Sequence, residues 1–338
     1  MLNKTTRTQR IIMAVTAVVA GIFMIYFAPT MGMQTLKIAL ESVMERLIPF
    51  DPDFYPAVPI LGATYSIWML LLFLAGAFSI LLTKKVYEGE HWARSTMLGL
   101  SAIPAVAGMT MLIPWMVLVV SDYSTGPVAG ILPPPEGIAV MPPVMWVMLL
   151  GLLFYYIFLL ADQDTIKNKI LKLIPYTFLG VVAGMVFMNG QHGVRYFIFL
   201  PEYLTYTSAF EPLGNFFTNL DHYNALELTT ISQAQIDAGQ IARNAKAVYD
   251  PNTLTLLLGG FGNYIASFMM VLAIPFLALK KKAGYYIVSV AALATALIGL
   301  DGFIVRHSHE WLIGGVMSAV LFIMFQLPIF KQYFVEKA

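Results

Sequence analysis

The chain has 338 residues, of which 59% are hydrophobic and only 12% are charged, and its formal net charge is +1. An ordinary globular chain carries about 25% charged residues. This composition and a mean hydropathy of +0.74 exclude a water-soluble fold and predict an all-α integral membrane protein. The near-zero net charge argues against a nucleic-acid partner. The chain contains no cysteine, which excludes disulfides, thiolate metal sites and cysteine nucleophiles.

Eight stretches are apolar for long enough to cross a bilayer, whose hydrocarbon core needs roughly 20 residues of helix. They lie at about 11–29, 58–83, 97–121, 143–162, 174–190, 254–279, 285–305 and 311–330. The fifth is the shortest, and the apolar run from Val194 to Leu200 can extend it. The first is too long for a removable signal peptide, and no small-residue cleavage site follows it.

The basic residues set the expected orientation, because cytoplasmic loops of membrane proteins are enriched in Lys and Arg. With both termini in the cytoplasm, 14 of the 20 basic residues fall on that side: Lys4, Arg7, Arg10, Lys84, Lys85, Arg94, Lys167, Lys169, Lys172, Lys280, Lys281, Lys282, Lys331 and Lys337. The outer loops are longer, contain few basic residues and are rich in carboxylates. We therefore expect a multi-pass protein of the plasma membrane with an acidic outer face.

Two halves of the chain share a pattern that predicts a parallel repeat of four plus four helices. Val18-Val19-Ala20-Gly21 in the first span resembles Val181-Val182-Ala183-Gly184 in the fifth, and a long outer segment follows each of these spans. Since four spans per unit is an even number, the two units would have the same orientation. The expected units are 1–173 and 174–338, the second with an extracytoplasmic insertion at 191–253.

The outer segments contain two stretches with helical periodicity. Within 30–57, Met33, Leu36, Leu40, Val43 and Leu47 recur every three or four residues, which predicts an amphipathic helix along the membrane surface. Within 191–253, a stripe of small residues from Thr230 to Tyr249 predicts a helix that docks against another helix.

Aromatic residues are dense between positions 196 and 223. This density indicates anchoring in an aromatic belt at the membrane interface or, alternatively, a pocket for a quinone or lipid. The side chains expected to line such a pocket are Tyr196, Phe199, Tyr203, Phe216 and Phe217.

Four of the five histidines fall at or beyond the outer membrane face, close to carboxylates. Imidazole together with carboxylate suits copper or zinc, so the expected ligands of an outer metal site are His192, His222, His307, His309, Glu310 and Asp301. The alternative is that these polar groups cap helix ends at the interface. Asp162 and Asp164, on the opposite side, are expected to form a solvated helix end.

The apolar spans contain almost no ionisable side chains, although ion-coupled transporters and proton pumps place such groups inside the membrane. This scarcity favours a non-catalytic integral subunit or scaffold of a larger membrane complex, with an energy-converting assembly as the favoured case. Its partners would be the lipid bilayer and other membrane protein subunits. Two alternatives stay open: a transporter or channel for a small neutral or apolar solute, and a membrane enzyme with an outer metal site.

Overall fold

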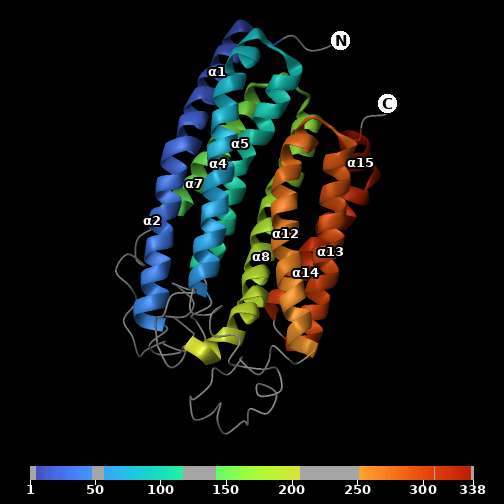
Figure 1. Ribbon diagram of the computed structural model, residues 1–338. Helices are drawn as coiled ribbons and strands as arrows, with labels where there is room; N and C mark the ends of the chain where they lie inside the picture. Colours follow the sequence, from blue (N-terminus) through green and yellow to red (C-terminus); the bar gives the residue numbers. More distant parts are fainter. Residues whose placement is uncertain (1–4, 48–56, 117–141, 206–250, 308, 336–338) are drawn as a thin grey trace.

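The computed structural model describes residues 5–47, 57–116, 142–205, 251–307 and 309–335. All the elements in these ranges are helices (Figure 1). They are α1 (Arg7–Ile22), η1 (Phe23–Phe27), α2 (Ala28–Glu41), η2 (Ser42–Leu47), α4 (Ala57–Glu88), α5 (His91–Trp115), α7 (Pro143–Ala161), α8 (Ile166–Thr205), α12 (Pro251–Ala278), α13 (Lys282–Arg306), α14 (His309–Gln326) and α15 (Pro328–Phe334).

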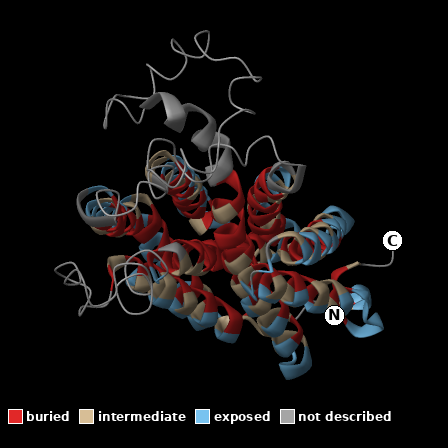
Figure 2. Ribbon diagram, turned by 90° about the horizontal axis from the view of Figure 1, so that it is seen from below, coloured by how far each residue is buried: buried red, intermediate tan, exposed pale blue. Residues whose placement is uncertain are grey.

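Eight of the described helices are long and apolar enough to cross a membrane. They coincide with the eight predicted spans, and the chain is a polytopic membrane protein. Its helices bury their inward faces and turn their outward faces away from the bundle centre (Figure 2). The outward faces are themselves apolar: Leu81, Leu160 and Leu297 have exposed fractions of 74%, 68% and 60%. Such faces are compatible with lipid contact.

The first helix is much longer than predicted. A capping box formed by Thr6 and Gln9 begins α1, and η1, α2 and η2 continue it without a break to Leu47. The predicted surface helix within 30–57 is therefore wrong. Leu36, Ala39 and Val43 are buried in the bundle, and α2 packs on α4 and α7. The apolar stripe thus covers neighbouring helices instead of lying on the membrane surface.

Helix α8 is also long, at 40 residues, and it includes the predicted extension from Val194 to Leu200. Both long helices begin level with short turns on one side of the bundle. Arg10 at the start of the first helix donates to the carbonyl of Glu88 in the turn between α4 and α5, and α8 begins shortly after the end of α7. Their extra length therefore extends toward the opposite side. The start of α1 and the short helix α15 both lie at the end of the bundle where these turns are (Figure 1).

The helices from each half of the chain pack on one another as a group of four, and the two groups are themselves in extensive contact. In the first group, the α1–α2 helix packs on α4 and α7, and α5 packs on both α4 and α7. In the second, α8 packs on α12 and α14, and α13 packs on both α12 and α14. Helix α5 joins the groups by packing on α8 and α12.

The seam between the two groups, meaning the surface along which they are in contact, is aromatic where α4 meets α8 and α12. Trp68 of α4 is fully buried, and its ring lies 5.1 Å from that of Phe268 on α12 and 6.4 Å from that of Phe187 on α8. Within the second group, close backbone contact requires glycine. A Cβ atom on Gly299 of α13 would lie 2.5 Å from the Cα of Gly315 on α14.

Candidate functional site

The contact between α8 and the start of α14 brings together two residues of the predicted metal site. His192 Nδ1 lies 3.2 Å from Glu310 Oε2. One turn earlier on α8, the Asn189 side-chain amide donates to the Glu310 backbone carbonyl over 3.2 Å. Gly314 on α14 leaves room for Asn189, since a Cβ atom there would overlap its amide nitrogen. An imidazole and a carboxylate are thus held side by side by a tight helix pair.

The other predicted metal ligands do not join this pair. His307 ends α13 in a left-handed conformation with φ of 54° and packs edge-on against Phe303. His309 begins α14, and Asp301 is exposed on α13. Within the described ranges, no three His, Asp or Glu side chains gather closely enough to hold a metal ion. His222 lies outside the described residues, so the metal site stays a prediction.

The predicted aromatic pocket cannot be placed. Tyr196, Phe199 and Tyr203 belong to the last turns of α8, where the structure describes the backbone and not the side chains. Phe216 and Phe217 lie outside the described residues, as does the predicted docking helix from Thr230 to Tyr249. A lipid or quinone site in this segment stays a prediction.

Asp162 and Asp164 do not form a solvated helix end. They belong to a charge cluster at the junction of α5, α7 and α8. Arg94, whose exposed fraction is 7%, pairs with Asp162, and Lys172 Nζ lies 2.7 Å from Asp164 and 3.8 Å from Asp162. From the sequence, Arg94 was expected only as a basic residue of a cytoplasmic loop. The cluster could have been predicted because basic and acidic residues occur together at the ends of three consecutive spans, on the same side of the membrane.

The ionisation of Asp164 reflects this arrangement. Burial by itself raises the pKa of Asp164, but the ion pair with Lys172 and the hydrogen bond from Asn168 outweigh it, and the pKa is lowered. Asn168 Nδ2 donates to Asp164 Oδ1 over 2.7 Å. The carboxylate is therefore held in its charged form, which suits a structural ion pair better than a group that exchanges protons.

Next to this cluster is a polar recess of about 430 Å³. Its lining residues are Gln9, Leu160, Asp162, Gln163, Asp164, Thr165 and Lys169. Lys169 Nζ donates to the carbonyl of Leu160 over 2.9 Å. Both acids are engaged by Arg94 or Lys172, so the recess shows charge pairing between helix ends and no arrangement of groups for chemistry.

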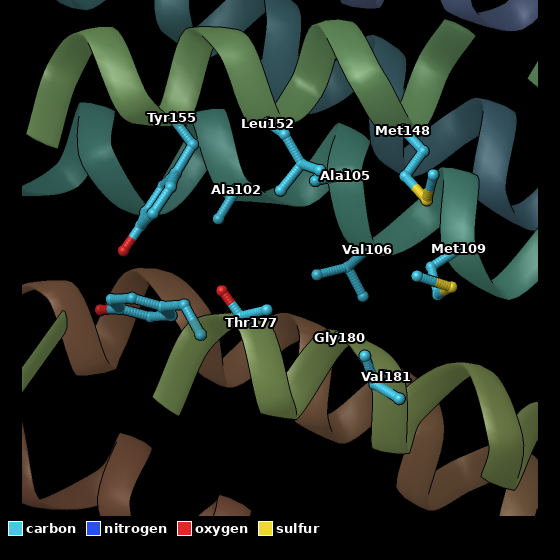
Figure 3. A pocket seen from close by; sticks show the side chains of 11 residues that line it. Ala102, Ala105, Val106, Met109, Met148, Leu152, Tyr155, Thr177, Gly180 and Val181 are labelled. Atoms are coloured by element: carbon cyan, nitrogen blue, oxygen red, sulfur yellow. The ribbon is translucent and has the colours of Figure 1, made fainter. Parts of the chain in front are cut away.

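A second cavity, of about 70 Å³, lies within the bundle between α5, α7 and α8 (Figure 3). Its walls are almost wholly apolar: Ala102, Ala105, Val106 and Met109 from α5, Met148, Leu152 and Tyr155 from α7, and Tyr176, Thr177, Gly180 and Val181 from α8. The Tyr155 hydroxyl is buried without a hydrogen-bond partner. The sequence does not predict this cavity, because the pattern of one helix carries no information on the distance between two other helices.

A set of buried polar side chains lies inside the second group of helices. Asn189 Oδ1, both side-chain polar atoms of Asn263, and Ser318 Oγ are buried without hydrogen-bond partners. Gly190 lies against Tyr264, so the preceding Asn189 and the adjacent Asn263 come to the same level of the bundle. A polar group that is buried in an apolar interior without a hydrogen-bond partner costs free energy. These side chains are therefore candidates for binding a polar guest.

Comparisons of the chain with family models, with curated proteins and with solved structures find no match.

Proposed function

We propose that this chain is a non-catalytic integral subunit or scaffold of a larger membrane complex, with an energy-converting assembly as the favoured case. The observation that carries the proposal is the length of two helices. Arg7–Leu47 and Ile166–Thr205 each extend about 60 Å at 1.5 Å per residue. A hydrocarbon core about 30 Å thick needs roughly 40 Å of helix even at the largest tilts observed.

The extra turns favour a role in docking. They extend on the same side of the bundle, and the segments 48–56 and 206–250 continue from them. On α2 the extension is held in place, because the Val144 backbone N–H donates to Thr35 Oγ1 over 2.9 Å. The free face of this extension carries Met33 of α2 and Met44 of η2, with exposed fractions of 50% and 41%. A fixed helix with a partly apolar free face beyond the bilayer supports the binding of another subunit.

The proposed orientation places both termini in the cytoplasm, so that the long helix ends face the outside of the plasma membrane. The basic residues support it, because Lys84, Lys85, Lys167, Lys169 and Lys280 all lie at the ends of the short turns. The acidic outer segments would then favour a basic partner surface.

The parallel repeat of residues 1–173 and 174–338 stays part of the proposal. Two observations support it. In both groups each helix packs on the next and the first packs on the last. With Gly21 aligned to Gly184, buried positions of α1 such as Met13 and Ala20 coincide with the buried Tyr176 and Ala183 of α8.

The proposal is tested by purification of the chain from its native membrane in a mild detergent, followed by native mass spectrometry. We expect a complex of fixed stoichiometry. The double substitution Glu41→Lys and Met44→Asp on the outer extension should release the partner. Lys167→Glu, an exposed charge change at the opposite end, is the matched control and should leave the complex intact. Purification of an active, self-contained monomer would contradict the proposal.

A second function, transport of a small neutral solute, is favoured by the unpaired polar atoms inside the second group of helices, namely Asn189 Oδ1, the side-chain amide of Asn263 and Ser318 Oγ. These side chains offer amide and hydroxyl groups to an uncharged guest. The test is glycerol and urea uptake by proteoliposomes. Uptake above that of protein-free vesicles, lost in Asn263→Leu, would support transport, and uptake equal to that of empty vesicles would exclude these solutes.

An outer-face metal enzyme is a further alternative, and it rests on the His192–Glu310 pair. Metal analysis of the purified protein is its test. Bound copper or zinc that is lost in His192→Ala would support it, and metal-free wild-type protein would end it.

A further inference from the structure

We infer that the cavity between α5, α7 and α8 is a binding site for one acyl chain of a membrane glycerolipid, whose ester carbonyl accepts a hydrogen bond from Tyr155. This site lies inside the membrane-spanning part of the bundle. It is separate from the aromatic outer segment and independent of the proposed docking role.

The cavity exists because two helices that are consecutive along the chain diverge. Helices α7 and α8 both pack on α5, but they make few contacts with each other. Helix α5 therefore forms the floor of a groove, and α7 and α8 form its walls (Figure 3). Small residues at the floor and along one wall, Ala102, Ala105 and Gly180, leave the space open.

The groove opens toward the lipid. Thr177 on the α8 wall is exposed, and Met109, Met148 and Leu152 are only partly buried. Since these positions lie well within the spans Pro143–Ala161 and Ile166–Val194, the surrounding phase is hydrocarbon. A guest from that phase must be apolar over most of its length.

Tyr155 specifies what else the guest must carry. Its side chain lines the cavity, its exposed fraction is 3%, and its hydroxyl has no hydrogen-bond partner. An unpaired buried hydroxyl is unfavourable. The side chains around this hydroxyl cover it, so an acceptor oxygen on the guest would satisfy it by displacing them. Figure 3 shows that Tyr155 and Thr177 lie toward one end of the groove, whereas Met109 and Met148 lie toward the other.

The depth of Tyr155 fits an ester group. Tyr155 is six residues before Ala161, where α7 ends, so its Cα lies roughly 9 Å from that end. Its ring leans away from Met148, toward that end of α7 (Figure 3). The hydroxyl therefore approaches the edge of the hydrocarbon, where the carbonyls of glycerolipids lie.

The volume favours a slender chain over a ring. An engineered cavity of about 150 Å³ holds benzene, whereas this one measures about 70 Å³. A linear acyl chain can lie along the groove and leave it on the open side, but a quinone ring is too wide for the enclosed part.

The test uses the full-length protein, purified in mild detergent and supplied with phosphatidylglycerol and phosphatidylethanolamine, with lipid retention measured by native mass spectrometry. We expect one retained phospholipid per chain. Tyr155→Phe removes only the hydroxyl and should lower retention about five-fold, as expected for one lost hydrogen bond. Thr177→Phe, which fills the groove from its exposed wall, should abolish retention.

Two variants match these changes outside the groove. Tyr156→Phe removes a hydroxyl from the neighbouring, half-exposed tyrosine, and Leu153→Phe adds a ring to an exposed position of α7. Both should retain lipid as the wild type does, and thermal unfolding in detergent establishes that all four variants are folded. The inference is overturned if the wild type retains no phospholipid, if it retains only an isoprenoid quinone, or if the groove variants and their controls retain lipid equally.

Discussion

Arg94 is the one charged side chain that is buried within the described part of the chain. Its guanidinium pairs with Asp162 on a helix 68 positions further along the chain, so the contact ties α5 to the end of α7. Removal of one partner from a buried ion pair leaves the other charge uncompensated. Here Lys172 lies 3.8 Å from Asp162 and compensates in part.

We predict that Arg94→Gln lowers the free energy of unfolding by about 3 kcal/mol, at the low end of the cost of breaking a buried pair. Thermal unfolding in detergent micelles measures the effect. Lys85→Gln is the control, because Lys85 pairs with Glu88 and Glu90 in an exposed turn, where ion pairs contribute little. Equal stability of Arg94→Gln and the wild type would show that the pair contributes nothing.

The lowered pKa of Asp164 makes the stability of the folded chain depend on pH. Although burial opposes its ionisation, Lys172 and Asn168 lower its pKa in the folded chain, so the unfolded chain binds protons more readily. The contribution of Asp164 is therefore fully present above its unfolded pKa, about 3.9, and is lost as the pH falls through the lower folded value. The unfolding temperature should drop between about pH 5 and pH 3. The drop should be smaller in Asp164→Asn, and an unchanged pH profile in that variant would contradict the assignment.

The sequence predicted His192 and Glu310 as members of one metal site, and they lie together, but no third described ligand joins them and the metal site stays a prediction. His192 and Glu310 are rare polar groups near the ends of apolar spans, and the structure places them 3.2 Å apart. Tyr155 was not predictable, because its missing partner and the adjacent gap depend on how far apart α7 and α8 lie. Such distances between helices leave no periodic signal in either one.

At the scale of elements, hydropathy located all eight spans but not the full length of the helices. A run of apolar residues indicates only the part of a helix that lies in the membrane, and not how far the helix continues beyond it. The stretch from Thr35 to Val43 contains the charged residues Lys37 and Glu41, and the sequence therefore predicted a helix on the membrane surface. In the structure these two side chains pair with each other over 3.6 Å. Packing on α4 and α7 made this stretch a continuation of the first span instead.

Thr35 connects two elements and supplies a test of that packing. Its hydroxyl oxygen accepts from the N–H of Val144 at the start of α7 and its hydroxyl donates to the carbonyl of Met31. We predict that Thr35→Val lowers the free energy of unfolding by about 1–2 kcal/mol, since it leaves a buried backbone donor unpaired. Thr30→Val is the control, because the hydroxyl of Thr30 bonds only within its own helix, to Tyr26. Equal effects of the two substitutions would argue that α2 does not pack on α7.

For the whole molecule, the two groups of helices resemble each other in internal packing but differ at their junction. Gly21 faces Gly76 and Ile80 of its own group, whereas Gly184, at the matching position, faces Met109 and Ile113 of α5 in the other group. Helix α8 therefore packs on α5 across the junction in addition to α12 and α14 of its own group. Helices α7 and α8 both lie against α5 but make few contacts with each other, and the groove in which Tyr155 lies is between them.

The orientation of the whole molecule can be tested because the chain contains no cysteine, so single cysteines can be labelled without background. Glu41→Cys on α2 and Thr165→Cys between α7 and α8 replace exposed residues at opposite ends of the bundle. Neither change removes a basic residue, so the charge bias that sets orientation is preserved. A membrane-impermeant maleimide applied to intact cells should label Glu41→Cys and leave Thr165→Cys unlabelled until the membrane is permeabilised. The reverse pattern would place the termini and the short basic turns outside. The long ends of α2 and α8 would then face the cytoplasm, and a partner would have to dock from there.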